Sequence, residues 1–440
     1  MRFVLSQYIP DDARAATDIV DHVERLVIGG LVQGGDRLPP IRELADATGL
    51  APNTVAAAYR SLARRGTVVG RGRHGTFVAD TVVPPQPDPE IPLGLIDLGS
   101  GNPDPSLLPD LNEYLPGLRV PRVMYGDPPV APIIEGPARK IFEQSGIPAR
   151  EFAVVHGALD GVERSLQAHL RAGDRVAIEA PGWPAFSSLV HAMGMRPVPV
   201  RVDDRGMIPD RLAAVAGDVQ AVVVTPRFQN PTGAVIDEER SGQISRVLEP
   251  YPDVLVVEDD HAGLISGAPL FSIGAGRPRW VYVASVSKSL GPDLRLAFLA
   301  GDDRTVKHVL GRQSAGPGWV SHVMQALVAT ILDDPRTEPL LDRAIEAYAA
   351  RRIGLMSGLS ERGMPAMGST GLNVWVPVPD EQAVVAALAA AGFAVRAGER
   401  WRLGTPQAVR IAIGGFELWM VDPVCDAIAG ATDGHRTRGA

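Results

Sequence analysis

The sequence is poor in lysine and almost free of cysteine. Only three of its 440 residues are lysine, namely Lys140, Lys288 and Lys307, and arginine supplies the other forty basic side chains. The single cysteine, Cys425, excludes an internal disulfide framework and a cysteine-based metal site, and it is typical of a reducing compartment. We predict no metal site.

Long apolar runs are also absent, since none approaches the roughly 18 residues of a membrane span. The N-terminus "MRFVLSQYIPDDARAA" reaches acidic residues before any long apolar core, so it does not read as a signal peptide. An apolar fraction of 45% and a charged fraction of 21% are typical of a globular protein, which we place in the cytoplasm. The net charge of −8 argues against a surface coated with nucleic acid, although a local basic element can still exist.

A proline-rich stretch divides the chain. The segment "ADTVVPPQPDPEIPLG" at residues 79–94 contains five prolines and few groups that could form a core, so it reads as a stiff spacer. We therefore predict an N-terminal domain over residues 1–79, a linker over residues 80–95 and a large domain over residues 96–432.

The N-terminal domain contains two short helices joined by a tight turn. The first is expected to end at Gly49, and the second begins at Pro52, where the missing N–H of proline costs nothing. An upstream amphipathic helix completes a small core. The apolar positions of the helix pair follow helical spacing: Ile41, Leu44, Ala45, Thr48, Val55, Ala58, Tyr59 and Leu62.

The opposite face of the second helix carries small, amide and arginine side chains, which favours a DNA-binding helix-turn-helix. Two β-prone runs follow, Thr67–Val69 and Thr76–Val78, and they predict a hairpin wing that reaches toward phosphates. The alternative is an ordinary helix pair with solvated arginines. The candidate DNA contacts are Arg42, Asn53, Thr54, Arg60, Arg64, Arg71, Arg73 and His74.

These segments resemble the winged helix of the GntR family over residues 15–79. The matching signatures are "GDRLPPIRELA", "NTVAAAYRSLARRG" and "GRGRHGTFV". Pro52 stands where that family commonly has an arginine that reads the operator. Base preference is therefore expected to rest more on Asn53, Thr54 and Arg42.

In the large domain, short apolar runs alternate with helical stretches. "RVAIEAPG", "AVVVTPR", "VLVVEDD" and "VYVASVS" predict strands of a mostly parallel α/β sheet covered by helices on both faces. Ligands of such sheets bind at the carboxyl ends of the strands. Those ends carry Asp259, Asp260 and His261, and then Ser285, Ser287 and Lys288.

Lys288 is notable because arginine replaces lysine almost everywhere else. Lysine can form a Schiff base once its amine loses a proton, and arginine cannot. Ser285, Ser287 and Arg295 offer donors suited to a phosphate, and Asp259 could hold a protonated ring nitrogen. An aldehyde, a phosphate and an aromatic nitrogen in one ligand suggest pyridoxal 5′-phosphate (PLP). The alternative is a solvated structural lysine.

Other parts of a PLP site follow along the chain. Asn230 in "NPTG" could donate to the phenolic oxygen, and the indole of Trp183 could stack on the ring. The backbone at Gly157 and Ala158 could hold the phosphate at a helix start, and Arg410 could grip a carboxylate. Taken singly, Trp183 could equally be core, Asn230 a turn former and Arg410 part of an ion pair.

Residues 96–430 resemble the fold-type-I aminotransferases, on "SVSKSLGPDLRLAFLAG", "NPTG" and "MYGDP". The resemblance implies a smaller C-terminal α/β subdomain. It also implies a homodimer, in which Tyr125 reaches the cofactor phosphate of the partner subunit. The combination with a GntR winged helix resembles the MocR family of PLP-dependent regulators. "DDH" and "GPGWVSH" are most similar to its subgroup that responds to vitamin B6.

The sequence departs from the aminotransferase pattern in three places. His261 stands where a tyrosine usually bonds the phenolic oxygen of PLP, although it could instead merely cap its strand. Ala158 and Leu159 replace hydroxyl residues in the phosphate loop. The segment "PPVAPIIEGPARKIF" is proline-rich, so the entrance to the site is expected to be reshaped.

The leading hypothesis is a homodimeric regulator that binds operator DNA and whose DNA affinity responds to PLP or to a PLP-linked amine. A second hypothesis is a working aminotransferase with an attached DNA-binding domain, for which residual half-reactions alone would not be proof. A third is a dimerisation scaffold that has lost PLP, against which the retention of Lys288 argues.

Overall fold

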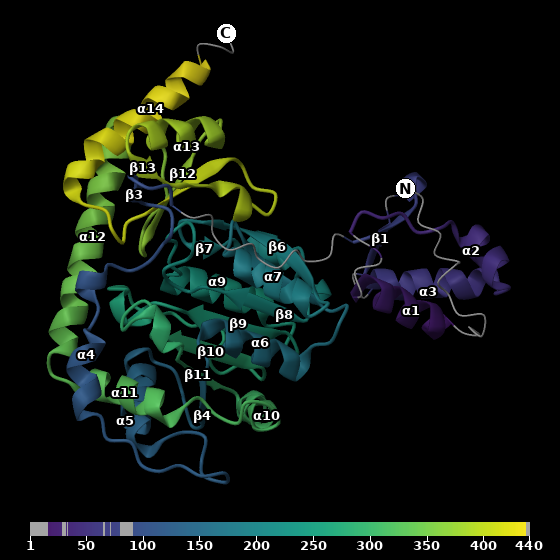
Figure 1. Ribbon diagram of the computed structural model, residues 1–440, viewed down its shortest axis with the longest axis horizontal. Coiled ribbons are helices and arrows are strands. Elements are labelled where there is room, and N and C mark those ends of the chain that lie inside the picture. Colours follow the sequence, from purple (N-terminus) through teal and green to yellow (C-terminus); the bar gives the residue numbers. More distant parts are fainter. Residues whose placement is uncertain are drawn as a thin grey trace. The chain divides into compact units, whose positions relative to one another are not determined.

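The computed structural model describes residues 16–28, 32, 34–64, 67–70, 72–79 and 91–436. The chain forms two compact units, which are described one at a time (Figure 1). Within the described ranges, no helix combines the length and the apolarity that a bilayer crossing requires.

The N-terminal unit contains three helices and a two-stranded antiparallel sheet. The helices are α1 (Ala16–Ile28), α2 (Ile41–Thr48) and α3 (Pro52–Arg64). The strands β1 (Val68–Gly70) and β2 (Thr76–Val78) pair across the turn between them. This is the winged helix that the sequence predicts, with the first wing strand displaced by one residue.

A glycine ends α2, and a small apolar core packs α2 against α3. Gly49 adopts the left-handed conformation, with φ of 68°, and stops α2. Val55 and Leu62 of α3 are completely buried against Leu44. Ile41 is 37% exposed, so its expected place in the core is wrong: the first turn of α2 lies at the edge of the apolar cluster.

The large unit is built on an eight-stranded sheet in the order β4-β11-β10-β9-β8-β5-β6-β7. β8, β9 and β10 are parallel, whereas β11 runs antiparallel to both β10 and β4. The prediction of a mostly parallel α/β sheet is confirmed. The strands are β4 (Phe152–Val155), β5 (Arg175–Ala180), β6 (Arg196–Asp203), β7 (Gly206–Met207), β8 (Ala221–Val224), β9 (Leu255–Asp260), β10 (Trp280–Ser285) and β11 (Ala297–Gly301).

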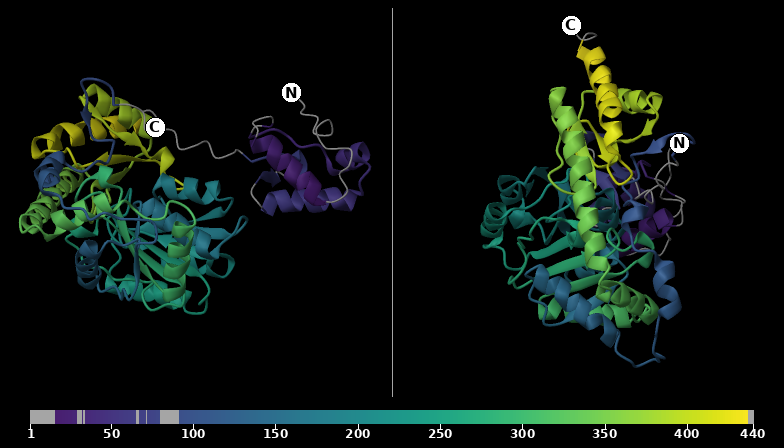
Figure 2. Two further views of the ribbon diagram at one scale, coloured as in Figure 1. Left: turned by 60° about the horizontal axis from the view of Figure 1, so that its bottom comes forward. Right: turned by 90° about the vertical axis from the view of Figure 1, so that its left-hand side faces the viewer.

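Helices cover both faces of this sheet, as Figure 2 shows. α6 packs against β9 and β10 on one face, while α5 and α11 share an apolar cluster with β10 and β11 on the other. The helices are α4 (Leu111–Tyr114), α5 (Pro132–Gln144), α6 (Ala158–His169), α7 (Pro184–Ala192), α8 (Pro209–Ala213), α9 (Glu238–Leu248), α10 (Asp303–Ser314) and α11 (His322–Asp333). Because β9 and β10 begin with apolar residues and are buried throughout, their polar ends stand out as candidate ligand groups.

A smaller α/β subdomain consists of β3 and of the elements that follow the long helix α12 (Thr337–Glu361), which runs along one edge of the large unit in Figure 1. Its sheet has the order β12-β15-β14, and β3 pairs with β13 in parallel. A separate apolar cluster joins these elements to α12. They are β3 (Ile96–Asp97), β12 (Asn373–Pro377), α13 (Glu381–Ala390), β13 (Phe393–Ala394), β14 (Arg396–Ala397), β15 (Ala408–Ala412) and α14 (Val421–Arg436).

Candidate cofactor site and nucleic-acid interface

Lys288 lies in the turn that follows β10 and is half-buried as a residue. Its Nζ donates a hydrogen bond to the carbonyl oxygen of Gly101 at 2.8 Å. Burial, and next the nearby charge of Arg410, lower the pKa of Lys288 to about 8. An amine with this pKa is partly unprotonated near neutral pH, which is the nucleophilic form.

Asp259 lies at the end of β9 with no exposed surface. Within the described residues neither of its carboxylate oxygens has a hydrogen-bond partner. The nearest ionisable nitrogen is Nδ1 of His261, 3.6 Å from Oδ2. A buried carboxylate without partners is costly, so a ligand that brings a charged N–H group to Asp259 would be bound favourably.

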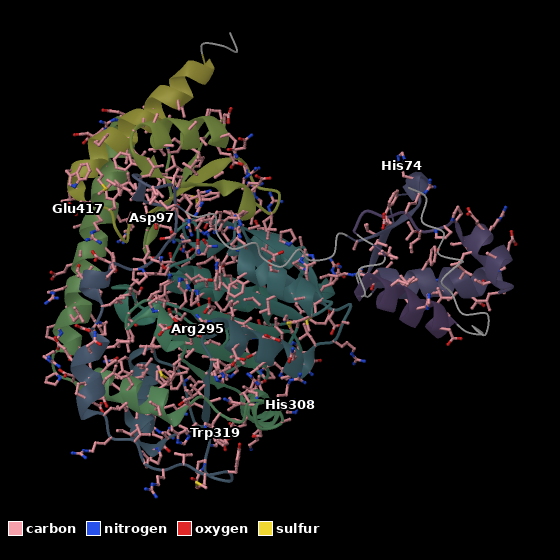
Figure 3. All side chains as sticks on the ribbon, viewed as in Figure 1. His74, Asp97, Arg295, His308, Trp319 and Glu417 are labelled. Atoms are coloured by element: carbon pink, nitrogen blue, oxygen red, sulfur yellow. The ribbon has the colours of Figure 1, made fainter. Side chains whose placement is uncertain are left out.

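Donors for an anion gather around the start of α6. Gly157 adopts a positive φ of 84°, and a Cβ placed there would lie 3.1 Å from the guanidinium of Arg295. α6 begins at Ala158, so its first N–H groups point toward the same place. Arg295, which Figure 3 labels, is exposed. Backbone amides and a guanidinium together suit a phosphate.

Two serines lie beside Lys288. Ser285 Oγ donates to Ser287 Oγ at 3.1 Å and accepts from the backbone N–H of Ser287 at 3.2 Å. Ser285 is buried and Ser287 is half-buried. Both hydroxyls keep free lone pairs and can turn a proton toward a bound anion.

Arg410 lies in β15 and is 4% exposed. Its guanidinium donates to the carbonyl oxygen of Gly99 and to Oδ1 of Asn230, the latter at 3.4 Å. It also lies over the ring of Trp401, 4.4 Å from the centroid. The segment from Gly99 to Gly101 therefore contacts both side chains: the Gly99 carbonyl accepts from Arg410, and the Gly101 carbonyl accepts from Lys288.

Three further predicted residues, His261, Trp183 and Tyr125, are more exposed than Asp259 and Arg410. His261 is half-buried and meets Phe228 edge-on, with ring centroids 6.4 Å apart. Trp183 is half-buried and packs on Phe186. Tyr125 is 95% exposed and contacts the ring of Trp319, which Figure 3 labels at the far end of the large unit from the C-terminus.

Glu179, near the end of β5, is a buried acid that the sequence analysis missed. It is 4% exposed, and its Oε2 accepts from Gln229 Nε2 at 3.3 Å. Burial, with the smaller contribution of the Asp259 charge, raises the pKa of Glu179 to about 8. The signal was present, because a charged residue inside the apolar run "RVAIEAPG" requires an explanation.

The candidate DNA contacts lie on the N-terminal unit. Arg42, Asn53 and Arg60 are exposed, while Thr54 is half-buried. His74 is exposed in the turn of the wing, where Figure 3 labels it. For Arg64 and Arg73 only the backbone is described, at the end of α3 and in the wing turn, and Arg71 lies outside the described residues.

The chain matches two protein families, "Bacterial regulatory proteins, gntR family" over residues 15–78 and "Aminotransferase class I and II" over residues 95–428. It is 38% identical over 404 residues to the vitamin B6 salvage pathway transcriptional repressor PtsJ of Salmonella typhimurium, covering 90% of this chain and 93% of that protein. The chain belongs to the MocR family of regulators. The family predicted from the sequence is thus confirmed, and the gntR-type domain implies binding to DNA.

Other relatives of this MocR regulator support the same architecture. It is 24% identical over 449 residues to the pyridoxine biosynthesis transcriptional regulator PdxR of Corynebacterium glutamicum, covering 94% of this chain and 96% of that protein. The kynurenine aminotransferase of Pyrococcus horikoshii matches with a TM-score of 0.70 and 21% identity, over 78% of this chain and 91% of that one. The aspartate aminotransferase of Thermus thermophilus matches with a TM-score of 0.65 and 22% identity, over 77% and 92%. These structures show the fold, which belongs to a PLP-dependent family.

Proposed function

We propose that this MocR regulator binds PLP at Lys288, and that cofactor occupancy changes its affinity for an operator of vitamin B6 genes. Asp259 gives the main support for this proposal. Its buried carboxylate has no hydrogen-bond partner in the described chain, and the protonated ring nitrogen of PLP would supply the missing donor. The residues around it therefore fit the cofactor.

Each remaining side chain of the site has a role in this proposal. Lys288 is the covalent attachment point. The phosphate would be held by Ser285, Ser287, Arg295 and the backbone of Gly157 and Ala158, with Tyr125 contributed by the partner subunit of a homodimer. Asn230 and His261 would donate to the phenolic oxygen, and Trp183 would cover the ring. When bound, PLP supplies an electron-withdrawing ring and a reactive aldehyde carbon.

Arg410 is the proposed ligand for the carboxylate of an amino compound. Two of its present partners, the Gly99 carbonyl and the Asn230 amide, are neutral acceptors. A carboxylate would form stronger, charge-assisted hydrogen bonds with the same guanidinium. Such a compound would be the second effector of the regulator.

The link to vitamin B6 rests on the relatives. PtsJ is named for B6 salvage and PdxR for pyridoxine biosynthesis. A ligand shifts DNA affinity only if it binds one arrangement of the protein more tightly than another. We place the DNA-binding domain at residues 1–79, the linker at 80–95 and the PLP domain at 96–432.

The test is a comparison of three forms of the full chain on DNA from upstream of its own gene and neighbouring genes. Cofactor-free protein, PLP-loaded protein and Lys288→Ala would be measured at one salt concentration, because phosphate contacts make affinity depend steeply on salt. We expect PLP to change the affinity of the native chain and to leave Lys288→Ala unaffected. Equal binding by all three forms would refute a PLP signal.

A second candidate function is transamination, which the lowered pKa of Lys288 and the buried guanidinium of Arg410 favour. Sustained turnover of an amino acid with a keto acid would establish it. A single stoichiometric conversion would not, because bound PLP reacts with amines without being part of a catalytic cycle.

A further inference from the structure

A buried glutamine joins the two turns that carry Asn230 and Trp183. Gln229 has no exposed surface and directly precedes Asn230 in the turn after β8. Its Nε2 donates to the carbonyl oxygen of Pro181 at 2.9 Å, and Pro181 lies two residues before Trp183 in the turn after β5. Because β5 and β8 are neighbours in the sheet, this amide bridges the ends of adjacent strands.

The side-chain amide of Gln229 uses its full hydrogen-bonding capacity. Its Nε2 also donates to Oε2 of Glu179 at 3.3 Å. Its Oε1 accepts from the backbone N–H of Thr232 at 3.0 Å and from the hydroxyl of the same residue at 2.6 Å. Glu179 and Thr232 are buried as well. A buried amide is costly unless its donors and acceptors are satisfied, and a satisfied one fixes the orientation of the groups that it contacts.

The same residue closes the turn that contains Asn230. The N–H of Gly233 donates to the carbonyl oxygen of Gln229 at 2.6 Å, and the N–H of Gln229 donates to the carbonyl oxygen of Ala234 at 3.3 Å. Asn230 Oδ1 accepts from Arg410, so the amide nitrogen of Asn230 is the end that remains for the phenolic oxygen of PLP. The direction of this N–H donor therefore depends on a turn that Gln229 closes through both its main chain and its side chain.

The turn before Trp183 is held by two distant segments. Gln229 binds the carbonyl oxygen of Pro181, and the N–H of Gly182 donates to the carbonyl oxygen of Trp401 at 3.1 Å. The indole of Trp183 follows these two residues directly. A change at Gln229 would therefore move the donor to the phenolic oxygen and the cover of the ring together.

We propose that Gln229 is a positioning residue of the cofactor site, which sets the placement of Asn230 and Trp183 around the PLP ring. The inference rests on the proposed function, since both residues act on bound PLP. Gln229 touches no atom of the cofactor in this proposal and acts through the two turns that it joins. A site of this kind depends on the residues that hold its ligand contacts in place.

The test is a pH titration of the visible absorption of PLP attached to Lys288 in the full chain. The absorption changes when the Schiff-base nitrogen loses its proton, and a donor to the phenolic oxygen lowers the pH at which this happens. Gln229→Met should misplace the Asn230 donor, so we expect the midpoint to rise by about 0.5 to 1 pH unit. The midpoint reports on the hydrogen bond to the ring, so a general loss of packing would not move it.

Two further variants control for stability. Gln325→Met is the matched control, because Gln325 is also completely buried and its Nε2 donates to the carbonyl oxygens of Pro129 and Val320, away from the two turns. We expect it to keep the native midpoint even if it unfolds at a lower temperature. Thr232→Val removes one hydrogen bond to Gln229 and keeps the shape of the side chain, so it should shift the midpoint in the same direction by less.

The outcomes separate this inference from the proposed function. A native chain without absorption from lysine-bound PLP would refute the proposed function, and the inference with it. A normal titration of the native chain, with an unchanged midpoint in Gln229→Met and Thr232→Val, would overturn the inference alone. An equal shift in Gln325→Met would also overturn it, because the effect would then come from loosened packing. If Gln229→Met does not fold, the midpoint of Thr232→Val decides.

Discussion

The amine of Lys288 donates to the carbonyl oxygen of Gly101, 187 residues earlier in the chain. The same glycine approaches the guanidinium of Arg410, since a Cβ placed on Gly101 would lie 3.2 Å from Nη1. Two cationic groups thus meet at one short loop. Their proximity, after burial, is the second reason for the lowered pKa of Lys288.

The first prediction concerns the pH dependence of cofactor attachment. The pKa of Lys288 is lowered to about 8, so the reactive unprotonated amine increases as pH rises through that value. We expect the rate of PLP attachment to rise about tenfold per pH unit below about pH 8 and then to level off. Mass measurement of the borohydride-reduced pyridoxyl adduct after timed mixing would follow it. A rate that stays flat across this range would contradict the prediction, and Lys288→Ala serves as the blank.

The second prediction is that Asp259→Asn has opposite effects on the two forms of the protein. PLP affinity should fall about 10- to 100-fold, since a charge-assisted hydrogen bond contributes about 1.5–3 kcal/mol. The cofactor-free protein should unfold at a higher temperature, because a buried carboxylate without hydrogen-bond partners has been removed. Fluorescence titration and thermal unfolding would measure both quantities. A lower unfolding temperature of the cofactor-free variant would show that the carboxylate is satisfied in solution.

The third prediction concerns Glu179. Its folded-state pKa of about 8 exceeds the unfolded value of 4.5, so the folded protein holds a proton that the unfolded chain releases between those values. The stability of the native protein should therefore fall as pH rises from about 5 to about 8, by up to about 1.4 kcal/mol per pH unit from this group.

Glu179→Gln should flatten this dependence, and its stability relative to the native chain should increase with pH. Thermal unfolding of both proteins across that range provides the measurement, with Glu346→Gln as an exposed control. If the two curves run parallel, Glu179 is ionised in the fold.

The fourth prediction concerns the winged helix. Asn53→Ala should reduce specific operator binding by about 1–3 kcal/mol while leaving non-specific DNA binding almost unchanged, because amide side chains read base edges. Arg60→Ala should weaken both kinds of binding and reduce their salt dependence. Arg304→Ala, an exposed arginine of the large unit, is the control. If Asn53→Ala loses both specific and non-specific binding, Asn53 positions the helix on DNA and does not read a base.

The fifth prediction concerns Tyr125, whose side chain is 95% exposed in one chain. If it completes the phosphate site of a partner subunit, Tyr125→Phe should weaken PLP binding without changing the sedimentation of the dimer. PLP affinity of the native protein should also fall on dilution below the dimer dissociation constant. A monomer that binds PLP as tightly as the dimer would rule out a shared site.

The sequence predicts the groups that stand at strand ends, because alternation and strand length are local patterns. Asp259, Ser285 and Lys288 were placed in this way, and the sheet that carries them is confirmed. The contacts made by distant segments could not be predicted: nothing local indicates that the Gly101 carbonyl meets Lys288, or that Gly99 receives a hydrogen bond from Arg410. The Arg227–Asp260 ion pair was missed for the same reason, because it joins residues of two separate segments. Glu179, in contrast, left a local signal in the run "RVAIEAPG".

Asp259 and Asp260 are neighbours in sequence, yet they serve opposite sides of one strand. Which of the two carboxylates faces PLP depends on whether an even or an odd number of residues separates it from the start of β9. A single residue inserted into that strand would turn Asp260 to the PLP side and Asp259 to the side of Arg227, each one residue away from the native position of the other. A substitution within β9 therefore acts on one face of the strand, whereas a change in its length would disturb both faces at once.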